Sequence, residues 1–444
     1  MTITAPQSRL ILKTIMSTLR NNLASANMIE WEMHSQEMND RNGFIVSEQV
    51  SPDYVITETT GAVADLSGGV QDTVFGAQTF TLNKVFGLSM GASDIEAVTT
   101  LQSARKNKAL SNGISRLASR IDYHIFDVAA KGFNNSVGTW GQDIDTPVEF
   151  ASARTRLALN SLESDQDIVA ALNHTDHQQL ATYIYNDNAA LADEGVTAMR
   201  KGFRGMLDGI PIKATNQLAS ITTGTRSSGA GAINGAAQNV NYAAAADSGS
   251  NAGYYMTQEL LIDTLGANAT ISDGEVFTIA GVNAYDPEIG RSRGYLQNFV
   301  VVGAATADGA GAATVRIFPA IIVDDGTSTT GAAGVNRAHA TVDAAPADGA
   351  LLTFNGTAST LYTPKMMWKK EAVVAHSAPL IMPYTGQGFR RSLADAERDT
   401  VAPLMPRLWF YSDPNTGAHK CRVDLFIQAQ MRNRWMGVKF FGTA

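Results

Sequence analysis

Hydrophobic positions recur every three to four residues near the amino terminus, over residues 6–33. Pro6 suits the first position of a helix, because it has no amide hydrogen to donate and its φ is already helical. Five apolar side chains then follow at helical spacing: Leu10, Ile11, Ile15, Met16 and Leu19. The pattern predicts an amphipathic arm, which needs another surface to cover its apolar face.

A second helical pattern begins at Ser93-Asp94-Ile95-Glu96 and runs to about Gly132. The opening sequence is a capping box, in which the serine hydroxyl accepts an amide hydrogen and the glutamate reaches back. The second half has an apolar stripe: Leu110, Ile114, Leu117, Ile121, Ile125 and Val128. Residues 105–108 are polar on every side, and Gly113 costs about 1 kcal/mol relative to alanine in a helix interior. We therefore predict one long helix that bends or unwinds between Ser103 and Gly113.

Apolar and polar residues alternate between residues 42 and 89, on both sides of a turn-rich middle. This period of two predicts a long two-stranded hairpin. An isolated hairpin of two strands is only marginally stable in water, so we expect this arm to lie on a neighbouring molecule.

Helix and strand patterns alternate from residue 147 onward. We predict a helix over 147–162, a buried strand over 167–172 and a helix over 175–185 that Thr175 caps. Residues 202–218 then form a glycine turn and a short apolar strand. This alternation is typical of α/β material.

Gly, Ala, Ser and Thr dominate the next stretch, from residue 219 to residue 362. Four apolar runs separated by glycine turns predict strands at 276–279, 296–302, 313–323 and 351–354. These strands would make a small antiparallel barrel or sandwich. Ordinary core composition resumes at residue 363, so the simplest interpretation is a β-rich insertion in a larger body.

Four more strands are predicted after this stretch, at 368–375, 404–411, 421–429 and 435–441. The Asp, Pro and Gly residues at 413–417 are a strong signal for a hairpin turn between the second and third of them. We expect the last two strands to form a closing pair. The predicted fold class is therefore α+β.

Composition favours extensive protein–protein contact. Charged residues make up only 17% of the chain and hydrophobic residues 44%, so uncharged polar and small side chains must cover much of the surface. The net charge of −8 disfavours a protein that mainly grips phosphate, because such affinity comes from clustered Lys and Arg. Cys421 is the only cysteine, which excludes an intrachain disulfide and a four-cysteine zinc site.

The sequence favours neither export nor a membrane partner. The amino-terminal stretch contains Lys13 and Arg20 and has no long hydrophobic core, so we do not expect a signal peptide. The apolar runs at 299–305 and 317–323 are far too short to span a bilayer. We expect a chain that is made in a reducing cytoplasm.

The segment Gly87-Leu88-Ser89-Met90-Gly91 fits the nucleophile elbow of α/β-hydrolases. His376 or His419 would then serve as the base. An elbow also needs a glycine-rich oxyanion loop, and nothing in residues 1–86 resembles one. The competing interpretation is that Ser89 and its glycines end a strand before a helix cap, and a hydrolase that uses Ser89 is kept as the alternative function.

The sequence predicts no metal site and no cofactor. His174 and His177 would share a helix face, but two imidazoles without a third ligand do not make a site. The turns at 324–326 and 273–274 contain Asp and Gly but lack the regular oxygen ligands of a calcium loop. No glycine-rich nucleotide motif follows a predicted strand.

Two charged clusters are candidate contact sites. A basic patch on the long helix faces either nucleic acid or, more simply, solvent or another subunit. Its residues are Arg105, Lys106 and Lys108. The tip of a predicted hairpin at 285–293 either forms inter-subunit salt bridges or is an ordinary exposed loop. Its candidate contacts are Asp286, Glu288, Arg291 and Arg293.

Three segments, taken in order, resemble one known family. They are IVAALNHTD at 168–176, similar to a strand that ends in an Asn before a helix; LDGIPI at 207–212; and residues 368–379, similar to a returning strand. Together with the arm, the hairpin and the long helix, they resemble the major capsid proteins of tailed double-stranded DNA phages, which have the Hong Kong 97-type fold. The stretch between the second and third segments resembles the inserted antiparallel β-barrel domain of short-tailed-phage coat proteins.

The resemblance implies a division of the chain into seven parts. These are 1–42, an N-terminal arm; 43–91, an extended loop; 92–146, a peripheral domain with a spine helix; 147–218, the first part of an apical domain; 219–362, the inserted domain; 363–405, the return of the apical domain; and 406–444, C-terminal strands of the peripheral domain.

The resemblance also implies a structural virion protein that is not an enzyme. Its copies would form homo-hexamers and homo-pentamers of an icosahedral shell, which encloses double-stranded DNA without sequence-specific binding. A scaffolding protein and a portal are the implied partners, and assembly would take place in the host cytoplasm.

Three alternatives to this expectation are a covalently crosslinked shell, a cargo shell and a secreted adhesin. Some members of the family crosslink through a Lys–Asn isopeptide bond assisted by an acid. No residue here can be assigned to those roles from the sequence, and because the insertion would stabilise the shell, we expect non-covalent assembly. Encapsulin-type cargo shells share the fold, but the insertion and the extended loop are more like phage coats. A secreted adhesin is a third possibility, disfavoured by the absence of a recognisable signal peptide.

Overall fold

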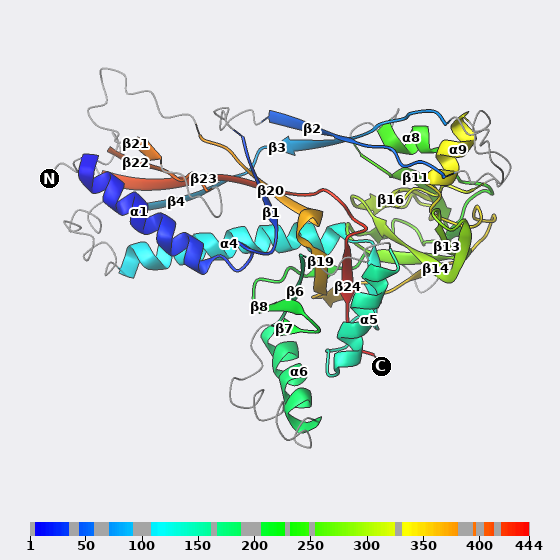
Figure 1. Cartoon of the computed structure of the whole chain (residues 1–444), viewed down its shortest axis with the longest axis horizontal. Helices are drawn as coiled ribbons and strands as arrows, with labels where there is room; N and C mark the ends of the chain where they lie inside the picture. The colour runs from blue at the N-terminus through cyan, green and yellow to red at the C-terminus, as the bar shows by residue number, and fades with distance from the viewer. Residues whose placement is uncertain are drawn as a thin grey trace, which may run out of the picture.

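The protein has a mixed α+β fold with an elongated shape (Figure 1). The computed structural model describes residues 5–34, 44–56, 71–91, 108–160, 167–187, 206–226, 231–247, 254–324, 331–380, 394–396, 404–412 and 419–443. No helix in these ranges is both long and apolar enough to cross a membrane.

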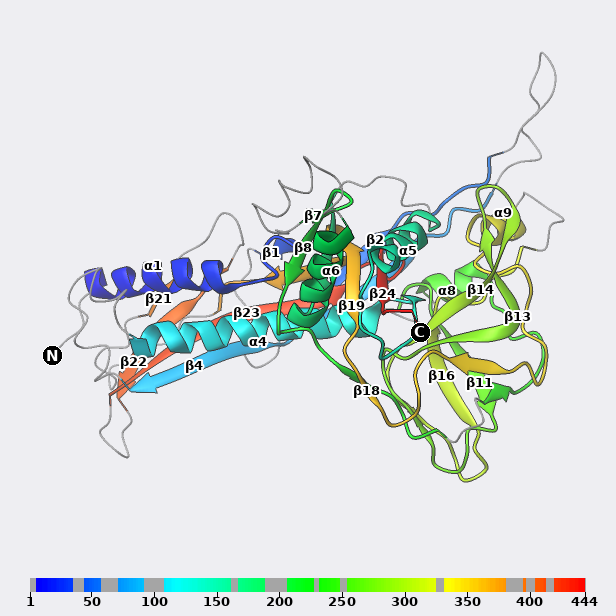
Figure 2. The same cartoon turned by 90° about the horizontal axis from the view of Figure 1, so that it is seen from below.

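Helix α1 (Ala5–Asn22) lies along helix α4 (Lys108–Gly132), and both run lengthwise through one half of the molecule (Figures 1 and 2). The facing apolar side chains are fully buried: Leu12, Ile15, Leu19, Ile114, Ile121 and Ile125. The predicted amphipathic helix and its packing surface are therefore confirmed as far as Asn22. The predicted pattern runs on to residue 33, but the helix does not, because residues 30–33 form a strand. The predicted capping box at 93–96 and residues 103–107 of the segment expected to bend lie outside the described residues. The rest of that segment, from Lys108 to Gly113, belongs to the continuous helix α4, so it is not unwound.

A six-stranded sheet is built around the long strand β23 (His419–Met431). One half of β23 pairs with two antiparallel neighbours, and the other half pairs with β20, which in turn has β1 as a parallel neighbour. The other strands are β1 (Glu30–Met33), β4 (Val85–Gly91), β20 (Val373–Ser377), β21 (Ala394–Ala396) and β22 (Arg407–Ser412). The expected β22–β23 hairpin is confirmed, and its turn at 413–418 lies outside the described residues.

A second six-stranded sheet brings together segments from the middle and the end of the chain. Its order is β5 (Asn135–Val137), β24 (Gly437–Phe440), β19 (Lys365–Lys369), β6 (Ile168–Leu172), β8 (Ile210–Ala214) and β7 (Met206–Leu207). Helices α5 (Pro147–Ala158) and α6 (His174–Asp187) accompany it. All of β6 is buried, as its continuous apolar run predicts.

The predicted cap of α6 is wrong by two residues. The Asp176 amide donates to the Asn173 side-chain oxygen at 2.6 Å, so Asn173 and not Thr175 satisfies the start of this helix. The predicted strands and helices of this part are otherwise confirmed, including the turn at Asp208 and Gly209, where both residues have positive φ.

A third six-stranded sheet lies at the other end of the molecule (Figure 2). Its order is β10 (Ala232–Ile233), β11 (Gln258–Asp263), β16 (Ala313–Phe318), β14 (Arg291–Val301), β13 (Val276–Asp286) and β17 (Leu352–Phe354). An antiparallel bridge between Ala232 and Leu351 joins its two edges, so the sheet nearly closes into a barrel around its own hydrophobic core. All four strands predicted in this stretch are present, and the sequence missed β10 and β11.

Short elements flank this barrel-like sheet. They are β9 (Ile221–Thr222), β12 (Thr270–Ile271), β15 (Ala305–Thr306), β18 (Leu361–Tyr362), α8 (Tyr242–Asp247) and α9 (Gly331–Ala338). Strands β9 and β18 pair antiparallel, Tyr362 with Ile221. The chain therefore enters and leaves this region through two adjacent strands.

Two predicted strand assignments are corrected by long-range pairing. The last two strands do not pair with each other, because β24 lies between β19 and β5 in a different sheet from β23. The predicted strand at 368–375 is two strands, β19 and β20, separated by a 3₁₀ turn at Lys370–Ala372. Each of these two strands belongs to a different sheet.

The predicted hairpin is present as β2 (Phe44–Val50) and β3 (Gly76–Leu82), in register from Phe44–Leu82 to Val50–Gly76. The hairpin was predicted to extend to residue 89, but it ends at Leu82, because the following strand β4 pairs with β23 instead.

Candidate functional site

The base of the β2–β3 hairpin is fixed to the body by a small apolar cluster. Phe80 and Leu82 of β3 are buried against Ala378, Leu380 and Phe426. This burial stabilises the hairpin, which two strands alone would not do.

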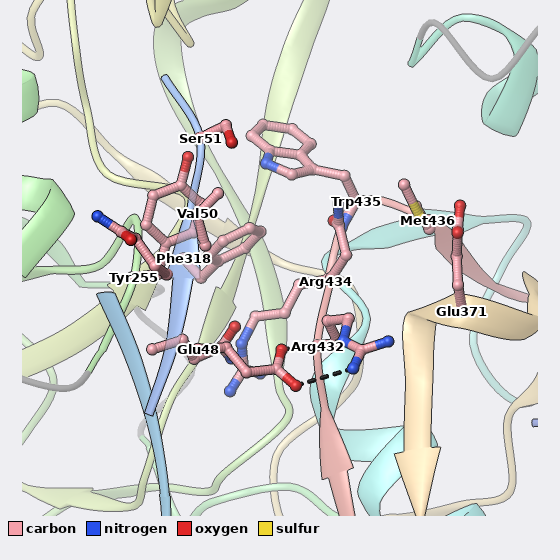
Figure 3. A pocket seen from close by; sticks show the side chains of 13 residues that line it. Glu48, Val50, Ser51, Tyr255, Phe318, Glu371, Arg432, Arg434, Trp435 and Met436 are labelled. Atoms are coloured by element: carbon pink, nitrogen blue, oxygen red, sulfur yellow. Dashed lines mark hydrogen bonds and ion pairs between the residues drawn. The ribbon is translucent and has the colours of Figure 1, made fainter. Parts of the chain in front are cut away.

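Arg432 joins three segments at this base. Its guanidinium lies 2.8 and 2.9 Å from the two oxygens of Glu48 (Figure 3). It also lies 2.6 Å from a Glu30 carboxylate oxygen and bonds Glu32. The hydrogen bonds to Glu48 lead the effects that raise the pKa of Arg432, against the opposing effect of burial. Bidentate pairing of this kind holds β1, β2 and the end of β23 in one geometry.

A cavity of about 570 Å³ lies beside Arg432, between the hairpin and the segment after β23 (Figure 3). Its lining includes Glu48, Val50, Tyr255, Phe318, Arg434 and Trp435. Trp435 packs edge-on against Phe318 with ring centroids 5.3 Å apart, and Arg434 donates to the Gly132 carbonyl at 3.1 Å.

The far part of the hairpin exposes large apolar side chains. Ile56 is 84% exposed, and Tyr54 and Phe75 are at least half exposed. The Gln71 side chain holds this part together, since it donates to the Val55 carbonyl at 2.8 Å and accepts from the Val55 amide at 3.0 Å. A held segment with several exposed apolar groups is typical of an interaction surface.

The predicted contact loop is the turn between β13 and β14. Arg293 pairs with Asp286 of the same chain at 3.4 Å, and both side chains are largely buried. Glu288 and Arg291 are exposed, and the neighbouring Ile289 is 63% exposed. Two of the four predicted contacts are thus joined within one chain, and two face outward.

The predicted basic patch is described only at its end. Lys108 is the exposed first residue of α4 as described. Arg105 and Lys106 lie outside the described residues.

Ser89 is not a nucleophile elbow. It lies in the middle of β4, opposite Arg422 of β23, and the strand runs from Val85 to Gly91 without the sharp turn that an elbow requires. The hydrolase alternative has no support in the described part of the chain.

Asp273 and Asp324 are the described aspartates of the two predicted turns, and each accepts a hydrogen bond. Asp273 accepts the Gly303 amide at 2.9 Å, and Asp324 accepts the Tyr285 hydroxyl at 2.6 Å. His174 and His177 both lie in the first turn of α6, and neither is in the metal-like cluster found among the described residues.

The sequence missed the Arg432 cluster because its members are separated by up to 402 positions. Glu30 and Glu32 alternate along a short strand, and Glu48 is an acid within an apolar strand pattern. Such spacing indicates that two acids share a face, but it does not identify the partner.

Comparisons with known proteins found similar structures but no matching sequence family. No family model matches, and no curated protein matches. Among solved structures, the chain is similar to Mycobacterium phage Che8 (10% identity, TM-score 0.37, 93% of this chain and 94% of that chain). It is also similar to the capsid of Ralstonia phage GP4 (8% identity, TM-score 0.41, 95% and 89%). A third similarity is to the CUS-3 coat protein I-domain (24% identity, TM-score 0.20), which covers 31% of this chain and 97% of that one. The solved structures similar to this chain are mostly phage capsid structures.

Proposed function

We propose that this chain is the major capsid protein of a tailed double-stranded DNA phage, a structural protein that builds a shell and catalyses no reaction. One observation carries the proposal: an ordered two-stranded arm is fixed at its base and exposes apolar side chains at its far part. A shell of identical subunits would bury these side chains at every neighbour contact.

The proposed architecture is the Hong Kong 97-type fold with an inserted barrel domain. Helix α4 is the spine helix of the peripheral domain, and the hairpin is the extended loop. The barrel-like sheet with its flanking elements is the inserted domain at 219–362, because β9 and β18 pair where the chain enters and leaves it. The divisions at 1–42, 43–91, 92–146, 147–218, 363–405 and 406–444 complete the proposal.

In the proposed assembly, hexamers and pentamers close into an icosahedral shell around the genome. The acidic balance of the chain suits a wall that encloses DNA without gripping it. A scaffolding protein and a portal are the further partners, assembly takes place in the host cytoplasm, and the product is located in the virion. The turn that carries Asp286, Glu288, Arg291 and Arg293 is the second proposed contact.

The experiment is assembly of the purified chain, followed by light scattering and negative-stain microscopy across a concentration series, with and without co-expressed neighbouring phage proteins. Uniform shells, or tubes and spirals of the same subunit, would support the proposal. A chain that stays monomeric under every one of these conditions would refute it.

A matched pair of variants tests the hairpin. Ile56→Asp places a charge at a hairpin position whose side chain is 84% exposed. Met206→Asp does the same at a position in β7 whose side chain is 60% exposed. Burying an isoleucine at a contact stabilises it by about 1.5–3 kcal/mol, so Ile56→Asp should raise the assembly concentration at least tenfold while the melting temperature stays unchanged. Equal assembly by both variants would exclude the hairpin as the contact.

A further inference from the structure

Strands β1 and β20 bring three side chains with potential metal-ligand atoms together. In the parallel register, Glu32 lies opposite His376 and Met33 lies opposite Ser377. The backbone amide of His34 donates to the Ser377 carbonyl at 2.9 Å, so the pairing continues one residue beyond the strand. Because side chains alternate along a strand, Glu32 and His34 share the face on which His376 lies.

The donor atoms of these side chains converge. His34 Nε2 lies 3.0 Å from His376 Nδ1, and His376 Nδ1 lies 3.6 Å from Glu32 Oε2. Donor atoms of all three residues lie within 4.8 Å of one another. Tetrahedral zinc with bonds of about 2.0–2.1 Å needs donor atoms roughly 3.3–3.4 Å apart. This separation lies between the 3.0 Å and 3.6 Å distances given above.

The local charge suits a divalent cation. The other Glu32 oxygen bonds Arg432, which also binds Glu30 and Glu48. Three carboxylates and one guanidinium leave this group with a net charge of −2.

His376 also has a second ring nitrogen without a partner in the described part of the chain. Its side chain is fully buried, and its Nε2 has no hydrogen-bond partner among the described residues. Gln428 lies directly opposite His376 in β23, and its side-chain oxygen is likewise buried without a partner, so the two groups are not hydrogen-bonded to each other in the described structure. With a metal on Nδ1, the proton of His376 would reside on Nε2, and the Gln428 oxygen is the cross-strand candidate for the acceptor that would orient the ring.

We propose that Glu32, His34 and His376 form a binding site for a divalent transition-metal ion of the zinc class, with water as the fourth ligand. Two imidazoles and one carboxylate are a typical zinc donor set. Glu32 and His34 are only partly buried, so the ion can enter from solvent. The bound ion would clip the N-terminal strand β1 to β20, and this inference does not depend on whether the chain assembles into a shell.

The test is a titration of the full, unassembled chain with Co²⁺ and Zn²⁺ after treatment with a chelator. Co²⁺ should give the visible absorption of a tetrahedral site, which Zn²⁺ then displaces. His34→Ala or Glu32→Gln should weaken Zn²⁺ binding at least about 100-fold, since even loss of an outer partner costs about 10–100-fold. Glu30→Gln is the matched control, because it removes a carboxylate partner of Arg432 but no proposed ligand, and it should bind zinc like the parent chain.

A second readout needs no variant. Hydrogen exchange of the β1 amides and of the His34 amide should be slower with zinc than with chelator, because metal binding stabilises the state in which these amides are bonded. Any one of three results would overturn the site. They are a parent chain that gives no cobalt absorption, a His34→Ala variant that binds zinc as tightly as the parent, and a Glu30→Gln variant that loses zinc binding as fully as Glu32→Gln.

Discussion

The buried ion pair between Arg226 and Glu275 should hold the barrel-like sheet at the point where the chain enters and leaves it. Their side chains are only 4% and 2% exposed. Glu275 accepts the amides of Gly224 at 2.6 Å and of Ser272 at 2.7 Å, and Arg226 also donates to the Gly356 carbonyl. One pair therefore joins the segment after β9, the turn before β13 and the segment after β17.

Arg226→Met keeps most of the side-chain stem and removes the charge. The Glu275 carboxylate then stays buried with two amide donors but without its counter-charge. The guanidinium also lies 4.1 Å from the Phe354 ring centroid, a contact that methionine keeps only in part. Breaking a buried pair on one side costs about 3–5 kcal/mol, so we expect a loss of this size in the local stability of the barrel-like sheet.

Hydrogen exchange read by mass spectrometry measures this loss in the full chain, because it resolves the barrel strands from the rest. Exchange of β13, β14 and β16 amides should accelerate by about a hundredfold to a few thousandfold, since each 1.4 kcal/mol is a factor of ten. The control is Arg316→Met, which breaks a pair with Glu259 at 3.0 Å where Glu259 is 46% exposed. An exposed pair contributes about 1 kcal/mol or less, so equal effects of the two variants would refute the reasoning.

Two further predictions concern acid stability and the β13–β14 turn. Burial lowers the pKa of His124 to about 4, and the Lys84 ammonium adds to this effect. The contribution of the neutral imidazole is complete above pH 6.5 and is lost as pH falls toward 4, so His124 alone should account for about 3 kcal/mol of the drop in the free energy of unfolding over this window. Urea unfolding at a series of pH values should show a shallower drop for His124→Gln, and an identical drop would contradict it. Arg291→Glu should weaken particle assembly in light scattering and leave the free energy of unfolding within about 0.5 kcal/mol, because Arg293 and not Arg291 makes the ion pair with Asp286. Normal particles with unchanged heat resistance would exclude that role.

Local periodicity predicted the elements whose burial depends on one face. The stripe through Ile114, Ile121 and Ile125 is buried as expected, and the apolar run of β6 is buried throughout. The cap of α6 was misplaced because Asn173 and Thr175 are both good capping residues, and propensity does not distinguish sites two residues apart.

Long-range pairing is the part of the fold that periodicity does not encode. The sequence shows that the strands before and after Arg432 are apolar, but not that one pairs with β20 and the other with β19. The charged triplet Lys369-Lys370-Glu371 was the available signal that the predicted strand at 368–375 breaks, since a buried strand does not hold three consecutive charges.

Both candidate sites depend on such pairing and so escaped prediction. His34 and His376 are 342 residues apart, and the parallel register of β1 with β20 is what brings them to 3.0 Å. A lone histidine in an apolar strand is ordinarily a core residue. Spacing rules for metal ligands apply within one element or one loop, and they do not reach across two strands from opposite ends of a chain.

The hairpin combines an ordered base with an exposed far part, and a shell contact needs both. If an arm becomes ordered only on assembly, its loss of conformational entropy reduces the favourable free energy of every contact that it makes. Here Phe80 and Leu82 are buried, and Arg432 ties β2 to β1, so the chain orders the base of the arm before any neighbour arrives. Ile56 and Phe75 stay in water until a neighbour covers them. In the proposed shell, a defect at Arg432 therefore weakens assembly through the fold of one subunit, whereas a defect at Ile56 weakens it through the contact alone.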